Sequence, residues 1–194
     1  FFGYITSSPA PLGMLADLLA AAANPNVGAW TLAPVATEIE VQAVRWIAEL
    51  IGFPASSAGL MVSGGNMANL VGFFAARAAG APWDIRAQGA SPEGKKLRVY
   101  ASGETHTWIQ KATDLAGIGT DSVRWIATDA RQRMKMDALA DAIAADRAAG
   151  DVPLLVVGTA GSVSTGAIDP LREIAALCRE QELWFHVDGA YGGF

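Results

Sequence analysis

A single carboxylate follows a short apolar run near the end of the chain. Residues 183–187 have the composition of a strand buried on both faces, and Asp188 comes directly after them. In open α/β sheets, ligands bind just outside the carboxyl ends of the strands. The small residues Gly189 and Ala190 leave room beside Asp188, so a cationic ligand atom could bind there. Taken alone, the spacing fits equally well a carboxylate that only caps the next turn.

A glycine-rich turn is the second feature that could bind a ligand. Residues 59–62 predict a short strand, and Ser63-Gly64-Gly65-Asn66 and an apolar helical pattern follow it. Free backbone N–H groups and the helix dipole favour a phosphate at such a helix start, where the Asn66 amide can donate as well. The turn matches neither the dinucleotide fingerprint nor the P-loop. A tight turn without a ligand is the alternative.

Polar residues also follow two other predicted strands. His106 comes after a strand predicted at residues 97–101, and Thr159 lies in a hydroxyl-rich loop after a strand predicted at residues 153–157. That loop lacks the spacing of a nucleophile elbow. A lone histidine is more often a surface or capping residue than a catalytic one, but both histidines of the chain fall at predicted strand ends, which modestly strengthens the case for a functional role.

The order of the predicted elements explains how these residues could meet. From residue 59 onward the elements alternate as β-α-β-α-β-α-β-α-β, which predicts a mostly parallel sheet with helices on both faces. The carboxyl ends of parallel strands lie at one rim of the sheet. We expect four features at this rim: the turn at Gly65-Asn66, His106, the loop at Thr159, and Asp188.

Two helices are predicted before the first strand. The first is an apolar pattern at helical spacing that stops at Asn24-Pro25, and the second follows a capping box of Thr37 and Glu40. Their apolar faces suggest an arm that needs a partner surface. The sequence therefore predicts an N-terminal helical arm with a pocket loop, residues 1–54, and a partial α/β domain, residues 55–194.

Composition narrows the class of protein. The chain has 194 residues, of which 52% are hydrophobic and 17% charged, so extensive disorder is not expected. The net charge of -5 and the lack of a basic stripe argue against nucleic acid as a partner. No apolar run is long enough to span a membrane. The single cysteine, Cys178, predicts neither a disulfide framework nor a metal cluster, and it suggests a cytoplasmic location.

The four features of the rim suit one kind of ligand. It has a phosphate, a flat aromatic ring, and a ring nitrogen that benefits from a proton, as pyridoxal 5'-phosphate does. An aspartate beside the pyridine nitrogen keeps it protonated and makes the ring a better electron sink. A histidine can stack on the ring, and a hydroxyl such as that of Thr159 can reach its oxygen substituent.

The chain also closely resembles a known family, the group II pyridoxal-phosphate-dependent amino-acid decarboxylases, which include the aromatic-L-amino-acid, glutamate and histidine decarboxylases. The resemblance covers nearly all 194 residues. The motifs that carry it are Phe1-Phe2-Gly3-Tyr4, Thr37-Glu38-Ile39-Glu40, Ser63-Gly64-Gly65-Asn66-Met67-Ala68-Asn69-Leu70, Thr105-His106, Thr159-Ala160-Gly161-Ser162 and His186-Val187-Asp188-Gly189-Ala190-Tyr191-Gly192-Gly193. Together these motifs are highly specific, although any one alone is weak.

This resemblance implies a fold and an activity. The fold is the large domain of fold type I, the aspartate aminotransferase-like pyridoxal-phosphate enzymes, here incomplete. The activity is decarboxylation of an L-amino acid, aromatic or small, to the amine, in a homodimer. The family's Schiff-base lysine is expected beyond residue 194, so the chain resembles a fragment. The alternatives are another fold type I enzyme (aminotransferase, aldolase or desulfurase) or a non-catalytic interaction module.

The resemblance also implies roles for individual residues. Gly65 and Asn66 hold the phosphate, and Asp188 pairs with the ring nitrogen. The other cofactor contacts are His106 stacked on the ring, Ala190 against its other face, and Thr159 as the residue that orients the cofactor. His106, Asp188 and Thr159 are the expected catalytic residues, and Tyr4 and Ser7 are expected to line the substrate side. His186 points to the same strand face as Asp188, which implies a supporting role.

Overall fold

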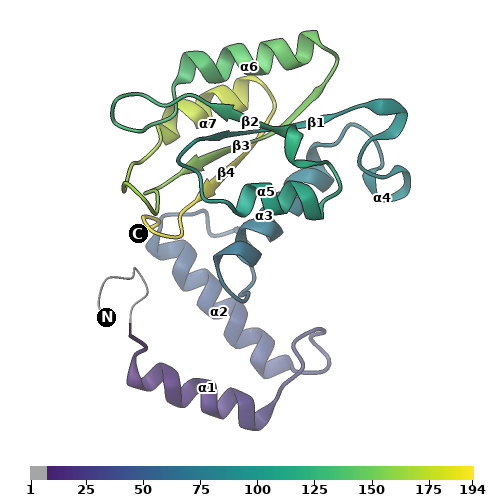
Figure 1. Ribbon diagram of the computed structural model, residues 1–194. Helices are drawn as coiled ribbons and strands as arrows, with labels where there is room; N and C mark the ends of the chain where they lie inside the picture. The colour runs from purple at the N-terminus through teal and green to yellow at the C-terminus, as the bar shows by residue number, and fades with distance from the viewer. Residues whose placement is uncertain (1–7) are drawn as a thin grey trace. The chain divides into compact units, whose positions relative to one another are not determined.

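A computed structural model describes residues 8–194 of the chain (Figure 1). The chain divides into two compact units, Phe1–Met61 and Val62–Phe194. The sequence placed the division at residues 54 and 55, inside what is here the first unit. Each unit is described by itself below.

The second unit is built on a sheet of four strands. They are β1 (Leu97–Ser102), β2 (Val123–Ile126), β3 (Val152–Thr159) and β4 (Trp184–Asp188), in the order β2-β1-β3-β4. Every neighbouring pair is parallel, as the sequence predicted. The carboxyl ends of the strands therefore lie at one edge of the sheet.

The strand predicted at residues 59–62 was wrong. These residues adopt no regular structure and pair with no strand in the described part of the chain. Leu60 and Met61 are exposed, and the backbone N–H of Met61 donates to the Glu40 Oε1 atom at 2.7 Å. In a sheet, a neighbouring strand would accept this N–H. Here a side chain of the second helix accepts it instead.

Helices cover both faces of the sheet. The helices α3 (Gly65–Gly80) and α5 (Trp108–Leu115) lie on one face, and α6 (Met136–Ala148) and α7 (Leu171–Glu180) on the other (Figure 1). The short helices α4 (Ile85–Gln88), η1 (Pro92–Gly94) and η2 (Thr120–Ser122) connect these elements.

The alternation of side chains along the strands builds two cores. In β1, Val99 and Ala101 pack in the cluster that contains α3 and α5, whereas Tyr100 packs in the cluster with α6 and α7. The two central strands, β1 and β3, are accordingly buried on both faces. The expectation that the last strand is equally buried was wrong: Trp184 is 38% and Val187 is 41% exposed. Strand β4 pairs only with β3 among the described residues, so one of its edges has no neighbouring strand.

A cluster of charged side chains lies near the amino ends of β1 and β2. Asp146 of α6 accepts hydrogen bonds from the Tyr100 hydroxyl and from the Arg124 Nε atom, both at 2.9 Å. Arg98 donates to Asp151 at 2.6 Å. Burial alone would raise the pKa of Asp146, but the hydrogen bonds from Arg124 and Tyr100 outweigh it and that pKa is lowered. This edge of the sheet therefore holds a satisfied ion-pair network.

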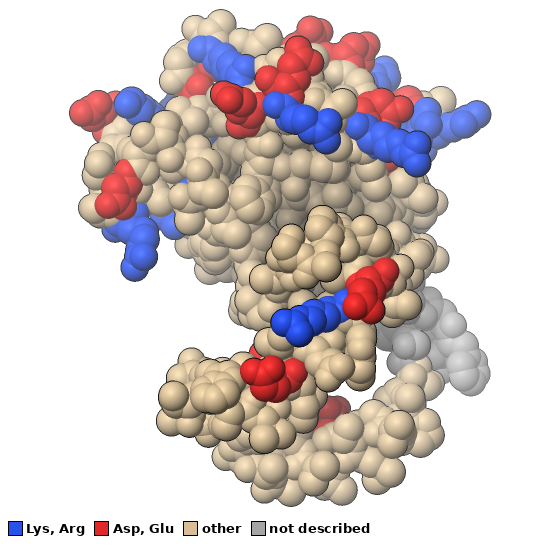
Figure 2. Space-filling view, turned by 180° about the vertical axis from the view of Figure 1, so that it is seen from behind, with Lys and Arg blue, Asp and Glu red and all other residues tan. Residues whose placement is uncertain are grey.

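The surface of the second unit carries charges of both signs. Figure 2 shows Lys and Arg side by side with Asp and Glu over the end of this unit where α6 and α7 lie, while much of the rest of that face is uncharged. In the described residues, no helix has both the length and the apolar character needed to cross a membrane.

The described residues of the first unit form two helices, α1 (Pro11–Ala23) and α2 (Pro34–Leu50). The capping box predicted for the second helix was wrong. The helix begins at Pro34. Proline suits the first turn of a helix, because the N–H groups of that turn have no acceptor within the helix and proline therefore loses no hydrogen bond. Thr37 thus lies inside the first turn, where its hydroxyl donates to the Ala33 carbonyl at 2.9 Å, and Glu40 accepts from Met61 instead.

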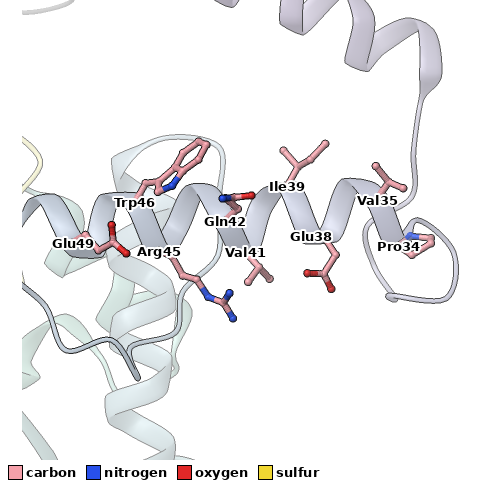
Figure 3. Close-up of a pocket in the computed structure, with 9 residues that line it drawn as sticks. All are labelled: Pro34, Val35, Glu38, Ile39, Val41, Gln42, Arg45, Trp46 and Glu49. Atoms are coloured by element: carbon pink, nitrogen blue, oxygen red, sulfur yellow. The ribbon is translucent and has the colours of Figure 1, made fainter.

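A pocket of about 600 Å³ lies along α2 in the first unit (Figure 3). Val35, Ile39 and Trp46 project from one side of the helix, and Glu38 and Arg45 from the other. Among the predicted site residues that the structure describes, none lines this pocket.

Candidate active site

Asp188 ends strand β4 at the carboxyl edge of the sheet and is 7% exposed. Its Oδ2 atom accepts hydrogen bonds from the Trp108 indole Nε1 at 2.8 Å and from the Asn69 Nδ2 at 3.2 Å. Its Oδ1 atom accepts one from the backbone N–H of Ala190 at 3.2 Å. The carboxylate thus caps the following turn, as the simpler interpretation of the sequence held. Two side chains from distant helices also fix it, and a turn cap does not require them.

His186 lies on the same face of β4 as Asp188, as predicted, and Asn69 connects the two. The Nε2 atom of His186 is 2.7 Å from the Asn69 Oδ1, and the His186 ring meets the Trp108 ring edge-on with centroids 5.3 Å apart. Burial lowers the pKa of His186, and the nearby Asp188 carboxylate only partly opposes this. His186 is therefore neutral at pH 7.

Thr159 ends strand β3 and is the register partner of Asp188 on β4. Its hydroxyl is 3.4 Å from that of Thr105, at the end of the turn after β1. Its backbone N–H donates to Asp169 Oδ2 at 2.9 Å, and the other Asp169 oxygen accepts from the Met134 N–H. Burial raises the pKa of Asp169, against the effect of these two hydrogen bonds. Asp169 thereby ties the loop after β3 to the loop before α6.

The glycine-rich turn begins α3. Gly64 precedes the helix with a φ of 88°, in the left-handed region that favours glycine. No side chain caps this helix start in the described structure, and Ala68, bonded to the Gly64 carbonyl, is the first residue whose N–H closes a helical turn. The N–H groups of Gly65 and Asn66 precede it at the exposed end. Asn69, one turn further on, touches Asp188, which places this helix start at the same rim.

The remaining predicted residues are at the surface of the rim or outside the described residues. His106 is exposed, and its Nδ1 accepts the backbone N–H of Trp108 at 3.3 Å. Ala190 is exposed beside Asp188. Tyr4 and Ser7 lie outside the described residues. The structure thus brings Asp188, Ala190 and Thr159 together directly, whereas His106 and the turn at Gly65-Asn66 join them through Trp108 and Asn69.

Two side chains that hold Asp188 were not predicted from the sequence, Asn69 and Trp108. Asn69 is polar within an otherwise apolar face of a helix, which is a usable signal. Trp108 has no such signal, because an aromatic residue at the start of a helix is an ordinary core residue. It is 1% exposed and belongs to the core around α3 and α5.

The residues present fit pyridoxal phosphate. Uncapped N–H groups at a helix start suit a phosphate, and they lie on the same rim as a buried, oriented carboxylate. The Oδ1 atom of that carboxylate accepts one hydrogen bond, from Ala190, and has a lone pair left for a cationic donor. The exposed His106 follows β1 and the buried Thr159 ends β3, so both residues stand at the carboxyl edge of the sheet.

The fold and the rim define an α/β domain of the kind that binds a phosphorylated aromatic cofactor at the carboxyl ends of its strands. The Pyridoxal-dependent decarboxylase conserved domain matches residues 1–194, so this chain belongs to the family of pyridoxal-dependent decarboxylases.

Known proteins of this family align over almost the whole chain. An aromatic-L-amino-acid decarboxylase from Bacillus atrophaeus is 35% identical over 192 residues, which is 99% of this chain and 38% of that protein. The crystal structure of mouse CSAD superposes with a TM-score of 0.91 at 34% identity, covering 100% of this chain and 40% of that one. The structure of Oryza sativa TDC with PLP and tryptamine gives a TM-score of 0.85 at 33% identity, covering 96% and 40%. The chain therefore spans about two fifths of the length of these relatives.

Proposed function

We propose that the protein binds pyridoxal 5'-phosphate and decarboxylates an L-amino acid to the corresponding amine. The observation that carries the proposal is the Asp188 carboxylate, buried at a strand end and fixed by three donors. Membership of the decarboxylase family supports this reaction over the aminotransferase, aldolase and desulfurase alternatives. Pyridoxal phosphate supplies a protonated ring that accepts the electron pair released when a bond to the α-carbon breaks.

Each residue of the rim has a role in this proposal. The N–H groups of Gly65 and Asn66 bind the phosphate at the start of α3. Asp188 holds the proton at the ring nitrogen, because a buried carboxylate stabilises a cation beside it. His106 covers one face of the ring and Ala190 the other, and Thr159 orients the ring through its hydroxyl.

The substrate and the assembly are proposed more coarsely. An aromatic or small L-amino acid is the proposed substrate, supported by relatives named for aromatic amino acids and, in other cases, for L-2,4-diaminobutyrate or L-aspartate. Tyr4 and Ser7 are proposed to line the substrate side. We also propose a homodimer, supported by the exposed leucines Leu12, Leu15, Leu18 and Leu19 of α1. A cytoplasmic location stays a prediction from the single cysteine.

The test uses the intact gene product with added pyridoxal phosphate. Binding is measured as a visible absorption band that persists after gel filtration. Turnover is measured as carbon dioxide and amine formed from a panel of L-amino acids: tryptophan, tyrosine, 2,4-diaminobutyrate, aspartate and glutamate. A folded protein with no such band contradicts the proposal and favours the interaction module. A band with an oxo acid as product, and no carbon dioxide, favours an aminotransferase.

A further inference from the structure

We propose that Trp108 and Asn69 are positioning residues that fix the Asp188 carboxylate, so that its Oδ1 atom is the one presented to the ring nitrogen. This inference rests on the proposed function, because it concerns how the carboxylate meets the bound cofactor. Neither residue was assigned a role by the sequence or by the resemblance. The inference depends on which lone pairs of the carboxylate are already occupied.

The donors are distributed unequally over the two carboxylate oxygens. Each oxygen can accept about two hydrogen bonds in the carboxylate plane. Oδ2 accepts two, from Trp108 at 2.8 Å and from Asn69 at 3.2 Å, so it is fully used. Oδ1 accepts one, from the Ala190 N–H at 3.2 Å. The lone pair that remains for a cationic partner therefore belongs to Oδ1.

Trp108 is suited to hold this arrangement. An indole N–H is only a donor, and a buried one needs an acceptor, so its bond to Oδ2 has no alternative direction. The ring is 1% exposed and packed in the core, which prevents it from turning away. The backbone N–H of the same residue donates to His106 Nδ1 at 3.3 Å. One residue thus contacts both the carboxylate proposed for the ring nitrogen and the histidine proposed for the ring face.

Asn69 has its amide orientation set by His186. The ionised Asp188 only accepts, so the Asn69 group that faces it must be the NH₂. The Asn69 oxygen then faces His186, whose Nε2 must carry the proton that bridges the 2.7 Å gap. Because burial keeps His186 neutral, this proton can be donated without placing a second positive charge near the carboxylate. The direction of the chain of hydrogen bonds is therefore fixed from His186 to Asp188.

The experiment compares Trp108→Phe with Tyr100→Phe in the intact gene product loaded with pyridoxal phosphate. Tyr100→Phe is a matched control, because it also removes one donor from a fully buried aromatic ring bonded to a buried aspartate, Asp146, on the other face of the sheet. Asn69→Ala is a second variant, which removes the other donor to Oδ2. All variants are compared at a temperature where circular dichroism shows them to be folded.

We expect Trp108→Phe to lower kcat about tenfold or more, because losing a hydrogen bond to a charged group typically corresponds to a rate factor of that size. KM should change less than about threefold. The induced circular dichroism of the bound cofactor should change, and the Kd for pyridoxal phosphate should rise. Asn69→Ala should act in the same direction. Tyr100→Phe should alter only the unfolding temperature.

The outcomes separate this inference from the proposed function. Wild-type protein that retains no cofactor contradicts both. Wild-type protein that binds cofactor and decarboxylates, with Trp108→Phe and Asn69→Ala indistinguishable from Tyr100→Phe in kcat, Kd and dichroism, contradicts the positioning inference alone. A loss of kcat with an unchanged dichroism signal also contradicts it, because the orientation of the ring would then be independent of Trp108.

Discussion

The ring of His186 lies directly against the backbone of Gly72 in α3. A Cβ atom at position 72 would stand 2.6 Å from both the Cε1 and the Nδ1 atoms of that ring, closer than real Cβ contacts. The Nε2 atom, next to Cε1 in the ring, bonds Asn69. His186 therefore contacts two residues of one helix through neighbouring ring atoms, and the absence of a side chain at residue 72 sets how near its ring can approach.

Gly72→Ala is expected to destabilise the protein although alanine is the better helix former. The helix gain is about 1 kcal/mol, whereas overpacking costs about 1–3 kcal/mol, and the imidazole is held by Asn69 and by Trp108. Denaturant unfolding measures the net loss. Gly13→Ala in α1 is the control, because a Cβ atom added there would meet no other described atom within 4 Å and only the helix gain should remain.

A double variant identifies the partner in this contact. In a His186→Ala background the clash is gone, so Gly72→Ala should there become neutral or stabilising. An equal loss of stability in both backgrounds would show that the conflict lies with some atom other than the His186 ring.

Asp188→Ala is expected to reduce turnover more than cofactor retention. The lost charge-assisted hydrogen bond weakens binding by about 1.5–3 kcal/mol, while the phosphate contacts at the start of α3 remain. The rate of the reaction should fall further, because negative charge moves into the ring as the bond to the α-carbon breaks and the protonated ring nitrogen stabilises that charge. Amine formation and dialysis of the cofactor give the two quantities, with exposed Asp141→Ala as control. Turnover near the wild-type level would refute the role of Asp188.

His186 predicts a particular pH dependence of stability. Burial lowers its pKa in the folded protein below the ordinary 6.5, so the unfolded chain binds the extra proton more readily. This contribution to stability is complete above about pH 6.5 and is lost as the pH falls through the folded pKa. His186→Gln keeps a donor toward Asn69 and cannot titrate. Its unfolding free energy should therefore decline less than that of the wild type between pH 7 and acidic pH, and parallel curves would argue against a buried neutral His186.

The ion-pair network at the other edge of the sheet should matter to stability. Asp146→Asn removes the charge that Arg124 and Tyr100 both contact, leaving the buried Tyr100 hydroxyl and the partly exposed Arg124 guanidinium poorly paired. Leaving the buried Tyr100 hydroxyl without its charged acceptor typically costs about 1–3 kcal/mol, and the Arg124 side chain, 36% exposed, adds less because solvent screens its charge. Asp129→Asn is the comparison, because Asp129 pairs with Arg133 at the surface, where solvent screens the charges. Equal effects on the unfolding midpoint would mean that burial does not distinguish the two pairs.

Cys178 should report on global unfolding. The thiol is 2% exposed within the core around α6 and α7, and burial raises its pKa to about 12. Both properties suppress the thiolate that alkylating reagents attack. Iodoacetamide at pH 8 should therefore modify Cys178 slowly in the folded protein and rapidly in denaturant, as mass spectrometry would show. Rapid modification under native conditions would indicate frequent opening of that core.

Much of the fold was predictable because its strands are short apolar runs between helical patterns. The strands predicted at residues 97–101, 153–157 and 183–187 were confirmed, with ends shifted by one or two residues. Residues 59–62 have a similar apolar composition, but composition does not reveal whether a neighbouring strand exists. The start of α2 was also misplaced. Pro34 and the capping pattern at Thr37 are both signals for a helix start, and the sequence alone does not show that the helix begins at Pro34.

The placement of Asp188 and Thr159 at one rim was predictable from the order of the strands. Asp188 and Thr159 stand at strand ends, and the parallel order of the sheet brings them together. The contacts of Trp108 and Asn69 with Asp188 join residues 80 and 119 positions apart in the sequence. No local spacing encodes such contacts, because they depend on how α3 and α5 pack on the sheet.

The pairing of Thr159 with Asp188 makes the site sensitive to insertions. Side chains alternate along a strand, so sliding β4 by one residue along β3 would place Val187 opposite Thr159 and turn the Asp188 carboxylate to the other face of the sheet. It would also carry His186 away from Asn69. One extra residue within β4 would therefore dismantle the site while leaving every side chain that forms it unaltered.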